Sequence, residues 1–373
     1  MEKHLHIVCL DVPYPVDYGG VFDLFYKITA LADAGIAIHL HCFEYGRGHQ
    51  PELEKYCVEV NYYPRQQGHK GFSHNIPYIV CSRSSPELMD KLLSDQYPIL
   101  LEGVHCSYLL RDERFRERKI FLRLHNIEYK YYRQLYHSEK GLFKKLYYWN
   151  ESHLLKRYEK GIANRAFIIS VSKKDAQSYR REFNASRVEY LPVFLPFRKI
   201  NPLAGNGCYC LYHGNLSVAE NELAATWLLE KVFKGLHTPL VIAGKNPSAR
   251  LQRLAHDHPD TCLVSNPSEQ EMQDMIAKAQ INIVPSFNET GVKLKLLNAL
   301  FNGRHCMINQ QDTEDGELQS LCHTFRDAAE CREKVRSLYE TPFTRHDTAL
   351  RENILSDQFD SHRQAGRLIE WIW

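Results

Sequence analysis

Residues 289–307 read E-T-G-V-K-L-K-L-L-N-A-L-F-N-G-R-H-C-M, and they follow an apolar segment that runs from Ile281 to Pro285. The apolar segment predicts a short buried strand, and Gly291 begins a segment whose leucines recur at helical spacing. Pairs of an apolar strand and a helical pattern alternate in this way from one end of the chain to the other. The alternation predicts an α/β fold in which helices cover both faces of parallel sheets.

Two lysines, Lys293 and Lys295, fall in the first turn of the predicted helix. The free amides of a helix N-terminus already carry partial positive charge, so cations are disfavoured there. Two lysines after a glycine turn therefore predict a bound anion, most simply a phosphate or a diphosphate. A solvated pair of lysines on an ordinary connection is the alternative, and this segment alone does not separate the two.

The length of 373 residues exceeds the size at which a single core stops growing, so we expect two domains. We predict an N-terminal Rossmann-like domain at 1–190, a linker at 191–207 rich in proline and glycine, and a second domain at 208–344. The tail at 345–373 is predicted to be helical and to pack on the first domain. Two doubly wound domains of this kind are expected to face each other across a cleft. The expected strands are His4–Leu10, Ala37–Phe43, Cys57–Tyr62, Ile99–Glu102, Ile120–Leu124, Ala166–Val171, Cys208–His213, Leu240–Ala243, Thr261–Val264 and Gln280–Val284.

Composition excludes several classes of protein. The formal net charge is only +2, which does not indicate a nucleic-acid partner. No run approaches 18 apolar residues, and the N-terminus lacks the pattern of a signal peptide. The eleven cysteines are scattered without a C-x-x-C motif, so we expect free thiols in a reducing cytoplasm and no metal site built on cysteine.

Glycine turns and polar residues recur after the predicted strands. An early loop, D-V-P-Y-P-V-D-Y-G-G, ends in Gly19 and Gly20, and His125 follows the strand that ends at Leu124. In the second half, Gly214 and Asn215 follow one strand, and Gly244 and Lys245 follow the next. Polar groups at the carboxyl ends of parallel strands are where α/β proteins bind ligands. Each turn is also a common connection by itself, Asn126 could cap a helix, and His125 could be a satisfied polar residue.

The order and spacing of these segments resemble the retaining family-4 glycosyltransferases of the GT-B fold, over nearly the whole chain. The likeness rests on the P-Y-P…G-G loop, on the H-N-x-E segment at His125, and on the strand–G–x–L turn at Gly214. Its most specific part is the family variant G-x-[KR]-x-K-x-x-E-A-x-x-x-G, which is matched at Gly291, Lys293, Lys295, Ala299 and Gly303.

The resemblance implies a nucleotide-diphosphate-sugar donor, based on uridine or guanosine, held mainly by the second domain. It implies catalytic or positioning roles for His125, Lys293 and Lys295. The donor-binding residues that it implies are Gly19, Gly20, Gly214, Asn215, Gly244, Lys245, Glu289, Thr290, Gly291 and Asn298.

Three positions depart from the family pattern. Asn298 replaces the acidic residue that grips the ribose, and Asn215 replaces an arginine. Glu289 precedes Asn298 by nine positions, whereas the paired glutamates of the family are eight apart. No D-x-D motif occurs, so we expect no metal cofactor, and the two lysines would neutralise the departing diphosphate.

The segment from Tyr129 to Lys160 holds eight Lys or Arg against three Glu, interleaved with aromatic residues. This combination could bind an anionic membrane surface, which would suit a lipid-linked acceptor. Two amphipathic helices whose aromatics fill the core are the alternative.

The sequence as a whole favours a cytoplasmic, metal-independent glycosyltransferase that transfers a hexosyl unit with retention to a glycan or a lipid-linked acceptor. A non-catalytic protein that binds a sugar nucleotide or a glycan, and a GT-B nucleotide-sugar epimerase, are the alternatives.

Overall fold

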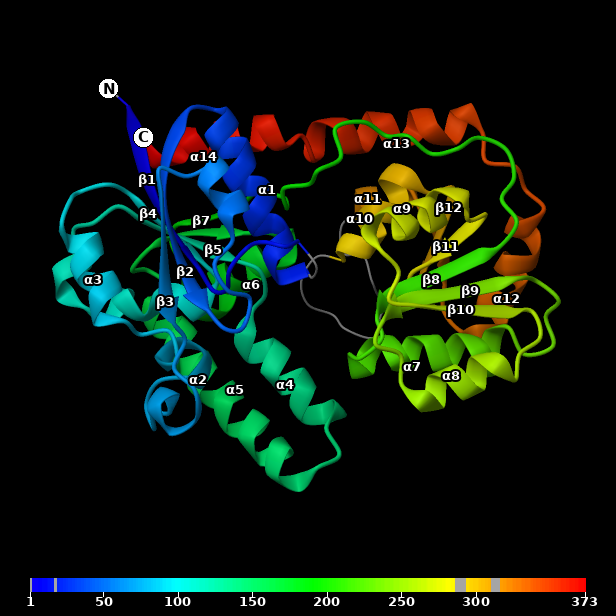
Figure 1. The fold of residues 1–373 in the computed structure, drawn as a ribbon, viewed down its shortest axis with the longest axis horizontal. Coiled ribbons are helices and arrows are strands. Elements are labelled where there is room, and N and C mark those ends of the chain that lie inside the picture. Colours follow the sequence, from blue (N-terminus) through cyan, green and yellow to red (C-terminus); the bar gives the residue numbers. More distant parts are fainter. Residues whose placement is uncertain (1, 17–18, 286–292, 310–315) are drawn as a thin grey trace. The chain divides into compact units, whose positions relative to one another are not determined.

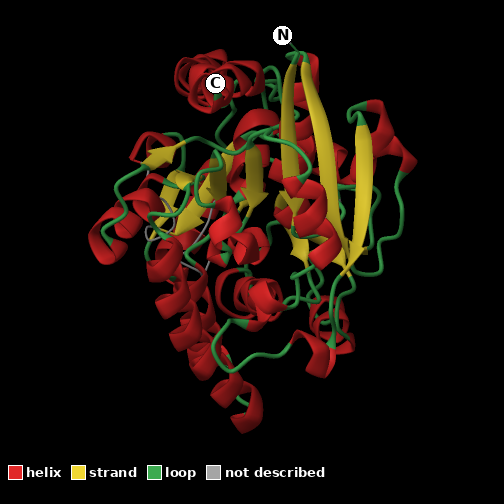
Figure 2. Cartoon of the chain, turned by 90° about the vertical axis from the view of Figure 1, so that its left-hand side faces the viewer, coloured by secondary structure: helices red, strands yellow, loops and turns green. Residues whose placement is uncertain are grey.

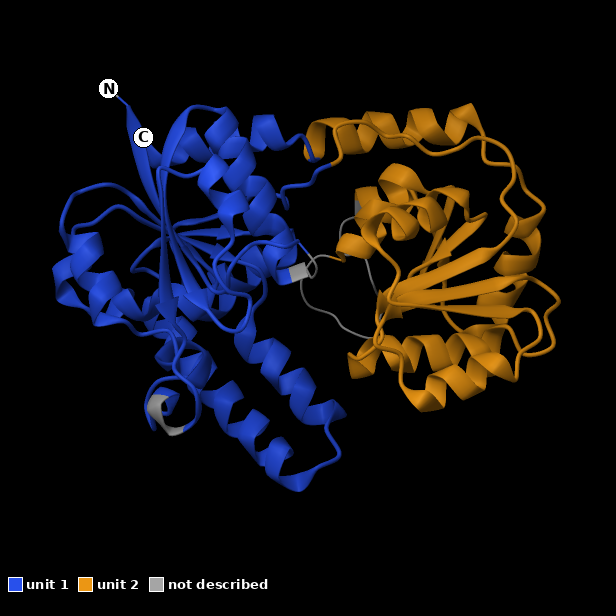
Figure 3. Ribbon diagram, viewed as in Figure 1, with its two compact units in different colours: residues 1–196, 290–292, 359–373 blue, residues 197–289, 293–358 orange. Residues whose placement is uncertain are grey.

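The computed structural model describes residues 2–16, 19–285, 293–309 and 316–373 (Figure 1). The described chain forms two compact units (Figure 3). The first unit contains residues 2–196 and 359–373, and the second contains the described residues from 197 to 358. The chain therefore passes between the units after Pro196 and again after Gln358.

A seven-stranded parallel sheet forms the centre of the first unit, with the strand order β3-β2-β1-β4-β5-β6-β7. Figure 2 views the molecule from the side of this unit, with strands in yellow and helices in red. Its strands are β1 (Lys3–Cys9), β2 (Ile36–Glu44), β3 (Glu59–Pro64), β4 (Ile99–Glu102), β5 (Ile120–Leu124), β6 (Phe167–Ser170) and β7 (Val188–Tyr190). Its helices are α1 (Gly19–Asp33), α2 (Tyr78–Cys81), α3 (Pro86–Leu93), α4 (Glu128–Ser138), α5 (Leu142–Ile162), α6 (Lys173–Phe183) and α14 (Ser361–Ile372). Every residue of β4 and β5 is buried, as expected for strands covered on both faces.

The second unit is built around a six-stranded parallel sheet with the order β10-β9-β8-β11-β12-β13. Its strands are β8 (Cys210–Asn215), β9 (Leu240–Lys245), β10 (Thr261–Ser265), β11 (Ile281–Ile283), β12 (His305–Asn309) and β13 (His323–Phe325). Its helices are α7 (Ala219–Trp227), α8 (Ala249–His256), α9 (Glu269–Lys278), α10 (Leu294–Asn302), α11 (Gly316–Ser320), α12 (Ala328–Tyr339) and α13 (Arg345–Gln358).

Both sheets reverse their order of growth beside their first strand, so the predicted pair of doubly wound, Rossmann-like units is confirmed. The list of predicted strands was incomplete, because it lacked β7, β12 and β13. β7 and β13 have three residues each, and β12 begins with His and Cys. Such short or mixed segments carry little hydrophobic periodicity, which explains the omission.

The last two helices belong to different units. Arg351 of α13 is buried in the second unit, where its guanidinium donates to the carbonyl oxygens of Leu300 (3.0 Å) and Gly303 (2.6 Å) at the end of α10. Helix α14 packs in the first unit beside α1, and the hydroxyl of Ser361 donates to the carbonyl oxygen of Leu195 (2.9 Å). Residues 345–358 and 359–373 thus stabilise separate cores.

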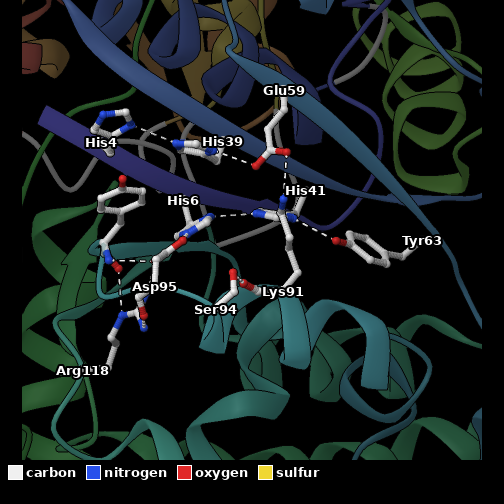
Figure 4. Close-up of polar contacts among 11 residues, drawn as sticks. His4, His6, His39, His41, Glu59, Tyr63, Lys91, Ser94, Asp95 and Arg118 are labelled. Atoms are coloured by element: carbon white, nitrogen blue, oxygen red, sulfur yellow. Dashed lines mark hydrogen bonds and ion pairs between the residues drawn. The ribbon is translucent and has the colours of Figure 1, made fainter. Parts of the chain in front are cut away.

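Histidines on β1 and β2 form a polar layer within the first unit (Figure 4). Nδ1 of His6 and Nε2 of His41 are 2.9 Å apart, and the other nitrogen of each ring bonds to Asp95 or to the hydroxyl of Tyr63. Burial and, to a smaller extent, the nearby His6 lower the pKa of His41 to about 3. The folded protein therefore keeps the imidazole of His41 neutral. Burial disfavours its charged form, and a positive charge on the neighbouring His6 would repel a second one.

Acid is expected to destabilise the first unit through His41. Since the pKa of this histidine in the folded state lies below its ordinary value of 6.5, the unfolded chain alone binds a proton as the pH falls from 7 to 5. The loss amounts to about 2 kcal/mol at pH 5. Urea unfolding of His41→Gln at both pH values should show a pH-dependent loss smaller by about this amount than in the parent protein.

His237 provides the control because its side chain is exposed. His237→Gln should leave the difference in the free energy of unfolding between pH 7 and pH 5 unchanged. The pKa of Glu59 is lowered to about 2, against the effect of burial, by hydrogen bonds from His39 and Lys91, so this carboxyl titrates below the window. An equal pH dependence in His41→Gln and the parent would contradict the assignment.

Candidate functional site

A buried network of charges lies directly behind His125 in the first unit. Helix α1 contributes Asp23 and Lys27, β4 ends in Glu102, and β5 contributes Arg123. Nζ of Lys27 lies 3.0 Å from Oδ2 of Asp23 and 2.7 Å from Oε1 of Glu102. Nη2 of Arg123 donates to Oδ1 of Asp23 at 2.9 Å. Two carboxylates thus face two permanent cations, and the network is neutral without the histidine.

Glu102 orients the ring of His125. Nε2 of His125 lies 3.0 Å from Oε2 of Glu102, and it lies 3.9 Å from Oδ2 of Asp23. Burial opposes the charge on Glu102, but Lys27 and the hydrogen bond from His125 lower the pKa of this carboxyl, so it stays ionised. An ionised carboxylate only accepts, which places a hydrogen on Nε2. Among the described residues no group bonds to Nδ1, and the side chain is 15% exposed.

The same side chains have the composition of a metal site. One ligand atom each of Asp23, Glu102 and His125 lies within 4.8 Å of the others. However, the carboxylates already bind two cations. Lys27 forms ion pairs with both Asp23 and Glu102, and Arg123 forms one with Asp23. A divalent cation would have to displace or repel these two buried cations, so the donor set fits charge pairing better than a metal.

The helix that follows His125 begins on a buried carboxylate. Oε1 and Oε2 of Glu159, on α5, accept the amides of Glu128 (3.2 Å) and Tyr129 (3.0 Å) at the N-terminus of α4. Burial and repulsion from Glu159 raise the pKa of Glu128 to about 8, against a hydrogen bond from Asn126. The N-cap residue of α4 is Ile127, so the alternative role of Asn126 as a helix cap is wrong. Glu159 satisfies these amides instead.

In the second unit, the carboxyl ends of β8 and β9 lie against each other. Gly214 pairs with Gly244, and Asn215 pairs with Lys245. A Cβ atom added at Gly244 would lie 1.8 Å from the carbonyl oxygen of Gly214, so only glycine permits this approach. Oδ1 of Asn215 accepts the amide (3.1 Å) and the hydroxyl (2.7 Å) of Ser217, which closes the turn into α7.

Lys295 reaches this same end of the sheet from α10. Its Nζ lies 3.4 Å from Oδ1 of Asn221, whose Nδ2 donates to the carbonyl oxygen of Asn215 at 2.9 Å. The ammonium also lies 5.2 Å from the ring centroid of Tyr212. Burial and the charge of Lys295 together lower the pKa of His213, the next residue of β8, to about 4. The lysine thus lies beside an amide, an aromatic ring and a neutral imidazole at the carboxyl end of β8.

The structure describes only some of the remaining predicted donor residues, and these belong to both units. Lys293 is the N-cap residue of α10, so it precedes the first turn in which it was predicted. Oδ1 of Asn298 accepts from Nδ2 of Asn302 at 2.8 Å, one turn further along the helix. Gly19 and Gly20 begin α1 in the first unit. Glu289, Thr290 and Gly291 lie outside the described residues.

Residues 207–341, which include all of these groups in the second unit, match the family model of the glycosyl transferases group 1. This part of the chain is a group 1 glycosyltransferase domain. A relative from Klebsiella pneumoniae, described as an uncharacterized 44.6 kDa protein in the cps region, is 29% identical over 317 residues. The match covers 79% of this chain and 80% of that protein.

Solved structures confirm the GT-B fold over nearly the whole chain. Sucrose-phosphate synthase from Thermosynechococcus elongatus is 12% identical with a TM-score of 0.72, and the match covers 99% of this chain and 98% of that one. WaaG, a glycosyltransferase involved in lipopolysaccharide biosynthesis, is 13% identical with a TM-score of 0.67, over 98% and 99% of the two chains. A glycosyltransferase from Rickettsia africae has a TM-score of 0.64 at 12% identity, over 100% and 98%.

The sequence did not reveal the groups that support these sites. In the glycosyltransferase domain it missed Tyr212 as a partner of Lys295, and in the first unit it missed Asp23, Lys27 and Glu102. A detectable signal existed for two of them, because an acid and a base four residues apart interrupt the otherwise apolar helix α1. No local pattern pairs either residue with Glu102, because the contact forms only when β4 and α1 meet in the fold.

Replacing Glu102 with alanine should destabilise the first unit by about 3–5 kcal/mol, because Lys27 would stay buried with one carboxylate fewer. Urea unfolding measures this loss, and Lys27→Met/Glu102→Met should recover part of it. The exposed pair of Lys278 and Asp274 is the control, since Asp274→Ala should leave the free energy of unfolding almost unchanged. Equal costs for the two alanine variants would show that the buried network is not a stabilising unit.

The contact between β8 and β9 makes a separate prediction for the glycosyltransferase domain. Gly244→Ala should lower the free energy of unfolding by about 1–3 kcal/mol, because the new methyl group meets a backbone oxygen. Gly366→Ala is the matched control, since its Cβ would meet no heavy atom within 4 Å in α14. It should stabilise the protein by about 1 kcal/mol. A neutral Gly244→Ala in thermal unfolding would contradict the close approach.

Proposed function

We propose that this chain transfers a hexosyl unit from a nucleotide-diphosphate sugar, with a uridine or guanosine base, to a glycan or a lipid-linked acceptor. The observation that carries the proposal is Lys295, which lies in a group 1 glycosyltransferase domain beside the glycine turns of β8 and β9. An ammonium group, a helix N-terminus and closely approached backbone together suit a diphosphate.

Two comparisons support the choice of donor and of product class. HepE from Anabaena, solved in complex with UDP and glucose, is 10% identical with a TM-score of 0.68 over 100% of this chain and 99% of its own. The Klebsiella relative is described by its place in the cps region, which agrees with the synthesis of a bacterial polysaccharide.

In the proposed reaction, the bond between the anomeric carbon and the diphosphate oxygen breaks, and an acceptor hydroxyl oxygen forms the new bond. The acceptor proton passes to the departing diphosphate, and the stereochemistry is retained. Lys293 and Lys295 would neutralise the charge that grows on the leaving group, without a metal ion. Gly214, Asn215, Gly244 and Lys245 would line the donor site at the sheet edge.

His125 would position the transferred sugar. Because the hydrogen on Nε2 is bonded to Glu102, the other ring nitrogen, Nδ1, is the atom that would accept a hydrogen bond from a sugar hydroxyl. The partial exposure of the ring and the absence of a partner for Nδ1 among the described residues support this role. Gly19 and Gly20 would bring the first amides of α1 toward the phosphates.

One observation favours a second candidate, a protein that binds the sugar nucleotide without turnover. Asn298 stands where the resemblance predicts an acidic residue. Its side-chain oxygen, Oδ1, already accepts a hydrogen bond from Asn302. A nucleotide-sugar epimerase is the third candidate. Product analysis separates the three, since an epimerase converts the donor without an acceptor and a binding protein converts nothing.

Lys295→Ala should weaken the binding of UDP or GDP by about 10- to 100-fold, because a hydrogen bond to a charged group contributes about 1.5–3 kcal/mol. Isothermal titration calorimetry in the presence of EDTA measures the effect, and Lys293→Ala/Lys295→Ala should abolish binding. The control is Lys278→Ala, since this lysine lies on α9 in an exposed pair with Asp274. Unchanged affinity in the double variant would refute the diphosphate site, and loss of parent binding in EDTA would refute metal independence.

A further inference from the structure

Helices α4 and α5 form a hairpin in the first unit (Figure 1). The hairpin carries an unusual concentration of exposed apolar side chains. Thirteen large apolar residues are exposed in the described chain, and five of them lie within eight consecutive positions. These are Leu142 (82% exposed), Phe143 (93%), Leu146 (63%), Tyr147 (39%) and Trp149 (48%). We call them the hairpin tip. A contiguous apolar patch of this kind is a mark of an interaction surface.

The outer surface of the hairpin is also strongly cationic, because its acidic residues turn inward. Residues 129–160 contain eight Lys or Arg and three Glu. Glu151 is 1% exposed and accepts the amide of Tyr78, and Glu159 is fully buried at the start of α4. Glu139 accepts the amides of Lys140 and Gly141 in the loop between the helices. Thus two of the three carboxylates are withdrawn from the surface, whereas the lysines at 140, 144, 156 and 160 are exposed.

A groove of about 380 Å³ lies between the two helices. Its lining is aromatic and basic, and it includes Tyr136, Trp149, Arg133, His137, His153 and Lys156. The described lining contains no acidic residue. Such a groove suits an anionic group attached to an apolar body, because aromatic faces and cations surround the same space.

One side of α5 carries both a part of the hairpin tip and a part of the groove lining. Leu142, Leu146, Trp149 and His153 are spaced by four, three and four residues, so they lie on one side of the helix. Trp149 and His153 line the groove, and their rings are 4.6 Å apart. A surface that contacts Leu142 and Leu146 therefore also lies close to the groove.

We propose that this face docks on a membrane surface rich in anionic lipids. The hairpin tip inserts its apolar side chains at the boundary between headgroups and acyl chains, the lysines bind the anionic surface, and the groove takes a lipid phosphate. Charge complementarity favours this occupant, since a phospholipid surface offers anionic groups above an apolar layer. The docking surface lies wholly within the first unit, so it does not depend on the proposed transfer reaction.

The test compares the flotation of the full chain with vesicles of phosphatidylcholine alone and with vesicles that also contain phosphatidylglycerol. At about 0.1 M salt or below, the parent protein should float with the anionic vesicles only, and about 0.5 M salt should release much of it. Phe143→Asp should lower the partition coefficient by about tenfold or more. Lys144→Glu/Lys145→Glu should lower it by at least about fivefold for each lysine changed.

Leu223→Asp is the matched control, because Leu223 is an exposed leucine (57%) of the second unit, outside the hairpin. It should float like the parent. The circular dichroism spectrum and the thermal unfolding of each hairpin variant should equal those of the parent, which shows that the variant is folded. Failure of the parent to float with anionic vesicles would overturn the proposal, as would Phe143→Asp that floats unchanged. A concentration-dependent dimer of the parent that Phe143→Asp abolishes, without flotation, would assign the face to a second copy instead.

Discussion

The ion pair between Lys27 and Glu102 is the constraint on which the first unit depends. It joins α1 to the carboxyl end of β4 with no access to water, and Asp23 and Arg123 extend it to β5. Asp23 also accepts the amide of Phe194 at 2.8 Å, and Arg123 donates to the carbonyl oxygen of Leu191 at 2.7 Å. The network therefore fixes the segment that follows β7 as well as the ring of His125. Burying four charges is costly by itself, so its benefit lies in the geometry that it imposes.

The second unit reaches its geometry by a different route. There the close approach of backbone at Gly214 and Gly244 brings two strand ends together without any side chain between them. The polar groups are added at the rim, where Asn221 links the turn at Asn215 to the ammonium of Lys295. A rim that combines amides with the ammonium group of Lys295 suits a ligand that brings its own negative charge. The network around Glu102 is neutral instead, which suits the uncharged hydroxyls of a sugar.

The sequence predicted the fold class and the positions of the glycine turns because both depend on local patterns. Buried parallel strands such as β4 begin with a run of apolar residues, here I-L-L, and a glycine is required where one backbone closely approaches another. It could not predict what holds His125, because Lys27 and Glu102 are 75 positions apart and meet only in the folded sheet. The sequence also left open that Asn126 caps the helix that follows His125. In the fold, Glu159 on another helix accepts the amides at this helix start instead. Local propensity predicts that a helix start must be satisfied, but tertiary packing decides which side chain does so.

Glu159 connects the two surfaces of the first unit. Its carboxylate accepts the amides of Glu128 and Tyr129, three and four residues after His125, and its backbone belongs to α5, which carries the hairpin tip. The hydroxyl of Tyr179 donates to the same carboxylate at 2.7 Å, so α4, α5 and α6 meet at this one group. Burial raises the pKa of Glu159 to about 7, and this rise is limited by the hydrogen bonds that it accepts. A displacement of α5 at a membrane would therefore act on the start of α4, because these hydrogen bonds cannot stretch without leaving buried amides unsatisfied. The docking face and the histidine that would meet the sugar are thus connected within a single unit, through α5, the hydrogen bonds of Glu159 and the backbone between Glu128 and His125.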